Sequence, residues 1–174
     1  SEAGRRRIVS SAHLVSDKAA ELSEVEYGLI VASNAFGLWT VRGTAAALAE
    51  FPDIADLGVI DILCLHSVNH RGRAKKLADI CFKLNVEDSH TVNYALKMLV
   101  KNELVQSETQ EKEVFYGTTK QEQALYMAYR DVRESCLVDE YADFGGGSGK
   151  PKAASLSEVA RRLRILFGLY DQAA

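Results

Sequence analysis

Proline and cysteine are scarce in this sequence of 174 residues, which contains only two prolines and three cysteines. Proline interrupts helices, so its scarcity, together with many Ala, Leu, Glu and Lys residues, favours a mainly helical chain. The cysteines (Cys64, Cys81 and Cys136) are odd in number and far apart, which argues against a disulfide scaffold and suits a reducing compartment. Because no signal-peptide pattern precedes them, we expect a cytoplasmic protein.

A long uninterrupted apolar segment is also absent. The longest apolar run, residues 29–49, is broken by Ser33, Asn34, Thr40, Arg42 and Thr44. The charge of Arg42 near its middle would be costly in lipid. We therefore predict a buried helix and no membrane partner.

Signatures of catalysis are missing as well. No nucleophile, base and orienting group can be grouped, and no glycine-rich phosphate motif follows a predicted strand. The glycine-rich residues 145–149 follow a predicted helix and are interpreted as a flexible hinge. We predict a protein that is not an enzyme and that has no catalytic residues, cofactor or metal.

Charge is unevenly distributed along the chain. The net charge is −3, which by itself argues against a nucleic-acid partner. Residues 69–101, however, contain seven Lys or Arg against three Asp or Glu, a local balance of +4. Affinity for phosphate depends on the face that is presented, so DNA stays open as a partner.

The N-terminal third reads as a basic tail (residues 1–12) followed by one long helix, residues 13–50. Apolar residues recur along it at steps of three and four, and a second apolar stripe runs beside the first. One small domain rarely covers so long a helix from two sides. We therefore predict that residues 13–55 form a dimerisation segment and that the protein is a homodimer.

The middle of the chain, residues 56–119, predicts a lobe of three helices and a β-hairpin. Asp56 is expected to cap a helix that reaches Val68, and the break at residues 69–72 leads to a helix over residues 73–84. A turn at residues 85–87 and a cap at Asp88 precede a helix over residues 89–101, with Val92, Leu96, Leu99 and Val100 facing inward. Two strands, residues 104–107 and 114–116, flank the polar turn 108–113.

The C-terminal segment, residues 120–174, predicts two further dimerisation helices joined by the hinge at residues 145–149. Thr119 and Glu122 form a capping-box pattern that opens the first helix, which should reach about Asp143. Ser155 and Glu158 form a second such pattern before an apolar stripe that ends at Tyr170. The expected fold is mainly α with a small hairpin wing, a winged helix-turn-helix between long dimerisation helices.

Two short helices joined by a tight turn and followed by a hairpin are typical of a DNA-binding lobe, because this arrangement delivers the second helix to the major groove. The outward residues of that helix carry groups that can bond base edges. We predict that they contact bases: Ser89, His90, Asn93, Tyr94 and Lys97. An ordinary solvated helix face is the alternative for the same residues.

The lobe resembles the MarR family of transcriptional regulators. Residues 88–96 and 101–105 are similar to that family's recognition helix and first wing strand, and Thr118 and Thr119 stand where the family leaves the wing. Residues 70–73 and 77–82 resemble a subgroup linked to L,D-transpeptidase and osmotic-stress genes. The resemblance covers residues 20–143 and implies a homodimer with two winged lobes on a pseudo-palindromic operator, often with a small effector between lobe and dimer helices.

Basic residues around the recognition helix are expected to hold phosphate rather than bases. The predicted phosphate contacts are Arg71, Arg73, Lys75, Lys76, Thr91, Lys101 and Lys112. This sequence departs from the family at the wing tip, which is acidic and has Lys112 as its only cation. It also has Glu103 where the family favours glycine, so Asn102 is the expected left-handed helix stop.

Arg42 is the most suggestive residue outside the lobe. A guanidinium on a mostly buried helix needs an anion, either a partner carboxylate in a salt bridge or an acidic effector. In the second case an effector pocket for a lipophilic or aromatic acid would include Asn34, Phe36, Trp39, Thr40 and Arg42. Both alternatives stay open from the sequence.

Three other interpretations are weaker. His66 and His70 near Cys64 have a spacing that metal ligands use, but Cys64 belongs to an apolar stripe. Of the three cysteines, Cys136 is expected to be the most accessible to oxidants. The serious alternative to DNA binding is a winged helix used only for protein contacts. The operator, its target genes, the effector and the sign of regulation are open from the sequence.

Overall fold

The computed structural model describes residue 16 and residues 19–138 and 153–173, and for residues 153–157 only the backbone. The chain forms two compact units that meet in sequence between Arg130 and Asp131. The predicted basic tail at residues 1–12 and the hinge at residues 145–149 lie outside the described residues. The predicted boundaries at residues 55 and 119 stay predictions.

The first helix, α1 (Ala20–Leu48), confirms the long N-terminal helix over the described part of its range. Its C-terminal turns are covered, with Thr40, Gly43, Thr44, Ala47 and Leu48 buried. The preceding turns are largely exposed in the single subunit, so their covering by a partner subunit stays a prediction. Gly43 lets α1 and α5 approach, since a Cβ there would lie 3.2 Å from the Tyr129 ring.

Helix α2 (Val59–Asn69) forms the centre of the lobe, where Ile62, Cys64, Leu65 and Val68 are buried. Its cap differs from the prediction. The helix begins after Gly58, whose backbone N donates to Oδ2 of Asp61 at 2.9 Å, so the expected Asp56 cap is wrong. The short 3-10 helix η2 (His70–Gly72) follows, with Arg71 in a left-handed conformation at φ 65°.

The predicted helix over residues 73–84 is in fact a strand and a shorter helix. Strand β1 (Lys75–Lys76) pairs with β3, and helix α3 (Leu77–Leu84) begins only after it. Asp79 in the first turn of α3 accepts from the backbone N of Lys76 at 3.3 Å. The left-handed Asn85 (φ 52°) ends α3 and turns the chain toward α4.

Helix α4 (Ser89–Lys101) is the predicted recognition helix, and its cap at Asp88 is confirmed. At its end Leu104 N donates to Leu99 O and Glu103 N to Val100 O, both at 3.0 Å, the bonds of a Schellman motif. The left-handed residue of that motif is Glu103 (φ 58°), whereas Asn102 has φ −84°. The expectation that Asn102 takes this conformation is therefore wrong.

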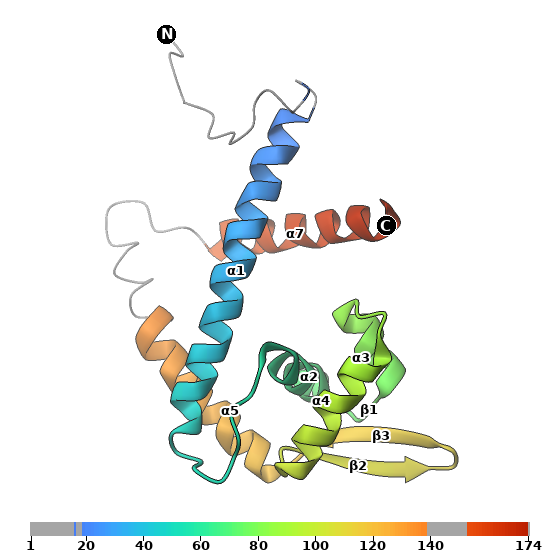
Figure 1. Cartoon of the computed structure of the whole chain (residues 1–174). Helices are drawn as coiled ribbons and strands as arrows, with labels where there is room; N and C mark the ends of the chain where they lie inside the picture. Colours follow the sequence, from blue (N-terminus) through green and yellow to red (C-terminus); the bar gives the residue numbers. More distant parts are fainter. Residues whose placement is uncertain (1–15, 17–18, 139–152, 174) are drawn as a thin grey trace. The chain divides into compact units, whose positions relative to one another are not determined.

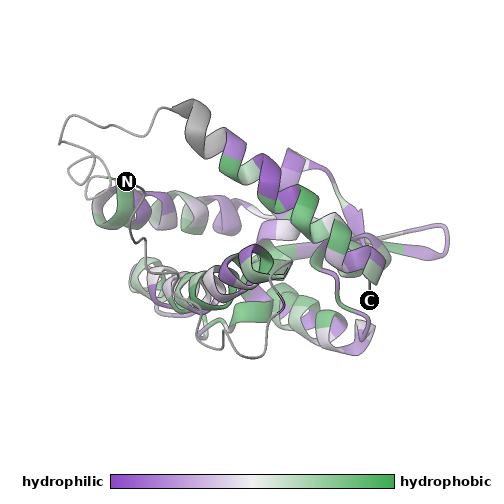
Figure 2. Ribbon diagram, turned by 90° about the horizontal axis from the view of Figure 1, so that it is seen from above, coloured by the Kyte–Doolittle hydropathy of each residue, from purple (hydrophilic) through white to green (hydrophobic). Residues whose placement is uncertain are grey.

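Strands β2 (Val105–Gln110) and β3 (Glu113–Thr118) form the predicted hairpin. The strands are longer than expected, since Gln110 pairs with Glu113 and leaves a turn of only Glu111 and Lys112. With β1 they make an antiparallel sheet in the order β1-β3-β2. The hairpin projects from the lobe beside α4 (Figure 1) and is mostly hydrophilic (Figure 2).

Helix α5 (Lys120–Arg133) continues as the π-helix η3 (Glu134–Val138), where the described part ends short of the expected Asp143. The Thr119 half of the capping box is confirmed, because its Oγ1 accepts from Glu122 N at 3.0 Å. The same hydroxyl donates to Glu103 O at 2.7 Å and joins α5 to the end of α4. Oε2 of the buried Glu122 carboxylate accepts no hydrogen bond from any residue that the structure describes.

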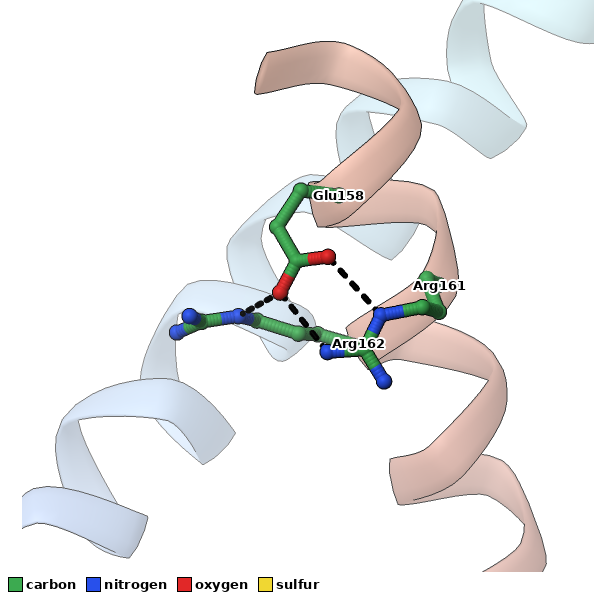
Figure 3. A network of polar contacts seen from close by, with 3 residues as sticks. All are labelled: Glu158, Arg161 and Arg162. Atoms are coloured by element: carbon green, nitrogen blue, oxygen red, sulfur yellow. Dashed lines mark hydrogen bonds and ion pairs between the residues drawn. The ribbon is translucent and has the colours of Figure 1, made fainter. Parts of the chain in front are cut away.

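The second unit contains helix α7 (Ala153–Ala173). It begins before Ser155, so the predicted cap at that residue is wrong. The Glu158 carboxylate instead accepts from Nε and Nη2 of Arg161 and from Nε of Arg162, each at 2.8 Å (Figure 3). These hydrogen bonds lower the pKa of Glu158 to about 2. Exposed pairs of this kind add little stability, so they mainly order the solvent side of α7.

Candidate nucleic-acid interface

Helix α4 is strongly two-sided. Val92, Ala95, Leu96 and Leu99 are buried against the rest of the lobe. The opposite stripe is exposed, and it consists of His90, Tyr94, Lys97 and Lys101. The stripe is polar apart from the Tyr94 ring, so α4 presents hydrogen-bonding and cationic groups to solvent.

The buried stripe differs from the predicted one in one residue of four. Ala95 is buried where Val100 was expected to be, and Val100 is half-buried. Asn93 lies half-buried at the edge of the exposed face, while Tyr94 is 68% exposed at its centre. Ser89 is exposed in the first turn. The structure thus places the five predicted base-reading residues on one side of α4.

The first turn of α4 is held by Asp88. Its Oδ1 accepts from His90 N at 2.9 Å, and its Oδ2 accepts from the Thr91 hydroxyl at 3.0 Å. The backbone bond to His90 and then the Thr91 hydroxyl keep the pKa of Asp88 below its usual value. Thr91 is exposed and its hydroxyl donates to Asp88, and its assignment as a phosphate contact stays a prediction.

Two of the lysines predicted to bind phosphate instead contact other groups within the lobe. Lys75 is 7% exposed, and its Nζ donates to the carbonyls of Val68 (2.8 Å), His70 (2.6 Å) and Arg73 (3.0 Å). It satisfies the end of α2 and cannot reach DNA, so its assignment as a phosphate contact is wrong. Lys76 forms an ion pair with Glu113 and lies 5.3 Å from the centre of the Phe115 ring.

The other predicted phosphate contacts remain accessible. Arg71, Arg73, Lys101 and Lys112 are all exposed. Lys112 is at the wing tip among the exposed carboxylates of Glu108, Glu111 and Glu113, so the wing is acidic, as the sequence indicates. The cationic surface therefore lies on α4 and on the segment between α2 and β1 rather than on the wing.

Comparisons with known proteins agree with this geometry. Residues 57–121 match the family model described as "Winged helix DNA-binding domain". This stretch is a winged helix DNA-binding domain. No curated protein matches the sequence.

Solved structures extend the likeness beyond the winged helix domain. RV1404 from Mycobacterium tuberculosis has a TM-score of 0.64 at 14% identity, with 84% of this chain and 95% of that chain covered. A MarR transcriptional regulator from Methanosarcina mazei Go1 has a TM-score of 0.57 at 14% identity, with 95% and 99% covered. Reduced AbfR bound to DNA has a TM-score of 0.57 at 18% identity, with 87% and 99% covered. The chain therefore has the MarR-type fold, and the narrower subgroup resemblance stays a prediction.

The residues predicted to form an effector pocket on α1 do not enclose one in this subunit. Asn34, Phe36 and Arg42 are exposed, and the Thr40 hydroxyl donates to Phe36 O at 2.7 Å. Trp39 packs beside Gly43. Because Arg42 is exposed, it does not need a buried anion, and the premise of the prediction is wrong for the single subunit.

The histidines and cysteines that the sequence analysis considered as metal ligands or reactive thiols lie in environments of other kinds. The His66 ring packs edge-on against Tyr126 and Tyr129, with ring centres 6.4 and 6.0 Å apart. Cys64 is buried, and desolvation raises the pKa of its thiol to about 12. Cys81 is half-buried, and Cys136 is exposed, as predicted. Within the described residues, no group of three His, Cys, Asp or Glu side chains could hold a metal, and no helix could span a membrane.

Several residues near the winged helix domain could not have been selected from the sequence. Ser67 is 2% exposed, and among the described residues its hydroxyl has no hydrogen-bond partner. It lines a cavity of about 840 Å³ together with Lys83 of α3 and Tyr126 of α5. These residues come from separate helices, and none belongs to a recognisable motif.

Proposed function

We propose that this protein is a transcriptional regulator that binds a specific DNA sequence through α4. The observation that carries the proposal is the exposed stripe of His90, Tyr94, Lys97 and Lys101 on the second helix of a winged helix DNA-binding domain. A helix in this position reaches the major groove in helix-turn-helix proteins. The fold is shared with a protein solved on DNA, which supports the same mode here.

The residues of α4 would make different DNA contacts, according to their position on the exposed face. Lys97 can bond the acceptors of guanine, and Asn93 can pair with adenine from the edge of the face. His90 and Tyr94 would contact bases or the flanking backbone, and Ser89 the first base edge. Arg71, Arg73 and Lys101 would hold phosphates, with a weaker contribution from Lys112 on the acidic wing.

The functional unit would be a homodimer on a pseudo-palindromic site. Large apolar side chains are exposed along α1, including Ile30 (60%) and Phe36 (63%), and along α7, including Phe167 (54%) and Leu169 (57%). Long helices with uncovered apolar residues are usually buried against another subunit. A second copy would cover them and place two α4 helices about one DNA turn apart.

Release by a small acid remains part of the proposal. Arg42 lies on the part of α1 that a second copy would cover, so the predicted pocket of Asn34, Phe36, Trp39, Thr40 and Arg42 would require the dimer. The salt-bridge alternative for Arg42 would be satisfied in the same interface.

Substitution of Lys97 tests the DNA-reading role. Lys97→Ala should weaken binding to the preferred duplex by about 1–3 kcal/mol and lower sequence preference, because it removes a base contact. Lys120→Ala removes the same charge from an exposed position on α5 and is the matched control. Equal losses for both variants on preferred and random duplexes in a mobility-shift titration would contradict base reading by Lys97.

One observation favours a second candidate function, in which the winged helix binds protein only. Phe82 on α3 is 88% exposed and the wing is acidic, and neither feature suits a DNA contact. Against it stands the exposed stripe of α4, which presents Lys97 and Lys101 to solvent. If the unmodified protein does not bind duplex DNA even at low salt, that result would favour this second function.

A further inference from the structure

Helix α4 exposes one large apolar side chain on an otherwise polar face. Tyr94 is 68% exposed, and it is the only large apolar residue that is exposed on α4, a helix that the structure describes in full. Its neighbours along the exposed stripe are His90, one turn before it, and Lys97, one turn after it. The ring therefore stands between two polar side chains at the centre of the face proposed to meet DNA.

The Tyr94 ring does not belong to the core of the lobe. The residues that hold α4 to the lobe are the buried Val92, Ala95, Leu96 and Leu99. Among the described residues, Tyr94 takes part in no hydrogen bond and in no contact with another aromatic ring. Burial of the apolar surface of such a ring is favourable, so a partner that covers Tyr94 would gain binding energy from it.

The place of Tyr94 along α4 favours a base edge as that partner. Tyr94 lies in the second turn after the Asp88 cap. Side chains near the N-terminus of a recognition helix are those that contact base edges in helix-turn-helix proteins. Lys101, two turns further along the same stripe, lies beyond that region and is proposed to hold phosphate.

The major groove of DNA offers one apolar group to an aromatic ring. All four bases present hydrogen-bonding groups at this edge, and thymine alone adds a methyl group, at C5. Contact between the Tyr94 ring and that methyl group would remove apolar surface of both partners from water. Asn93, the preceding residue, is proposed to pair with adenine, and every adenine in duplex DNA lies opposite a thymine. Asn93 and Tyr94 together therefore suit A·T base pairs.

We propose that Tyr94 recognises the C5-methyl group of a thymine at one position in each half-site. The inference rests on the proposed function and specifies the chemical group that one residue of α4 reads. The aromatic ring makes the contact, so the phenol hydroxyl is not needed for it. Cytosine at the same position would lack the methyl group, and methylation of that cytosine at C5 would restore the contact.

Replacement of single thymines by deoxyuridine tests the proposal, because it removes the methyl group and keeps every hydrogen-bonding group of the base. The DNA is the duplex that selection from random sequences enriches, and fluorescence anisotropy measures its affinity for the full chain. Replacement of one particular thymine in a half-site should weaken binding about fourfold, the effect of burying one methyl group. Deoxyuridine outside the half-sites is the control and should leave the affinity unchanged.

Variants of Tyr94 assign the sensitivity to its ring. Tyr94→Phe keeps the ring and should keep the preference for thymine over deoxyuridine. Tyr94→Ala removes the ring and should bind both duplexes with equal affinity, while the melting temperature of the free protein stays unchanged because the residue is exposed. Phe82→Ala is the matched control, since it removes an exposed aromatic ring from α3, and it should keep the preference for thymine.

Three outcomes would overturn the proposal and leave sequence-specific DNA binding intact. In the first, no thymine of the enriched duplex is sensitive to replacement by deoxyuridine. In the second, Tyr94→Ala keeps the preference for thymine. In the third, Tyr94→Phe loses it, which would assign the contact to the hydroxyl group. Failure of the proposed function itself gives a different result, because selection would then enrich no sequence and the wild type would bind all duplexes alike.

Discussion

Replacing Glu122 with glutamine should change how the protein's stability depends on pH. Glu122 is 1% exposed where α5 meets α1 and α2, and a small cavity there is lined by Thr44, His66, Tyr126 and Tyr129 but by no Lys or Arg. Burial raises the pKa of the Glu122 carboxyl from 4.5 to about 7. The neighbouring His66 gives no compensating charge, because burial lowers its own pKa.

The direction of the pH dependence follows from the linkage between proton binding and folding. A carboxyl whose pKa is higher in the folded state contributes stability that is fully present below the unfolded pKa and is lost as pH rises through the folded pKa. For Glu122 this window runs from 4.5 to about 7. At about 1.4 kcal/mol per pKa unit, the loss between pH 5 and pH 8 is about 3 kcal/mol.

Glu122→Gln removes the ionisation and keeps the side-chain shape. The variant should match the wild type near pH 5 and exceed its free energy of unfolding by about 2 kcal/mol near pH 8, allowing for the cost of a buried amide. Urea unfolding at both pH values and one fixed protein concentration measures this. Glu87→Gln, at an exposed carboxylate, is the control and should give parallel pH curves. A Glu122→Gln variant that loses the same stability at both pH values would refute the argument, because it would mean that the native carboxylate is charged and paired.

Three further predictions concern single residues of the winged helix domain. Lys75→Met should lower the free energy of unfolding by about 2–3 kcal/mol in urea titrations, because three carbonyls lose their donor; a loss below about 0.5 kcal/mol would show that water replaces the ammonium. Glu103→Gly should raise stability by about 0.5–1 kcal/mol, seen as a higher melting temperature, since glycine accepts the left-handed conformation without strain. An unchanged or lower melting temperature would contradict this. Arg73→Ala should weaken all duplexes alike and reduce the salt dependence of binding by about one unit, whereas Lys75→Met should leave that slope unchanged.

The helices of the domain could largely be predicted from the sequence because local chemistry determines them. Asp88 is a strong N-cap, and the apolar spacing after it allows only one face of α4 to be buried. One of the four residues of that face was misassigned because Ala95 is small and carries little apolar signal, while Val100 carries more.

Strand β1 could not be predicted in the same way. It consists of Lys75 and Lys76, which have no alternation of apolar residues, and only pairing with β3 makes them a strand. The burial of Lys75 also depends on tertiary structure, since three carbonyls from the end of α2 and the following loop converge on its ammonium group. A count of local charge treats such a lysine as surface charge.

The candidate DNA face needed only one helix, whereas the cavity of about 840 Å³ is lined by several segments. Ser67 comes from α2, Lys83 from α3 and Tyr126 from α5, and their spacing in sequence has no recognisable pattern. The predicted Arg42 pocket is not enclosed by the single subunit and stays a prediction for the dimer. The apolar pattern of α1 correctly indicated a covered helix over its last turns, but the pattern alone did not separate burial within the subunit from exposure on its surface.

Selection of bound sequences from random duplex DNA by the purified full chain tests the central claim most directly. The claim is that two copies of this protein read DNA through the exposed face of α4. The account predicts an enriched inverted repeat with half-sites about 10 base pairs apart, centre to centre. It also predicts that Asn93→Ala relaxes the preference at one position in each half-site. Recovery of sequences with no enrichment, or an unchanged motif when Asn93, Tyr94 and Lys97 are all replaced by alanine, would contradict it.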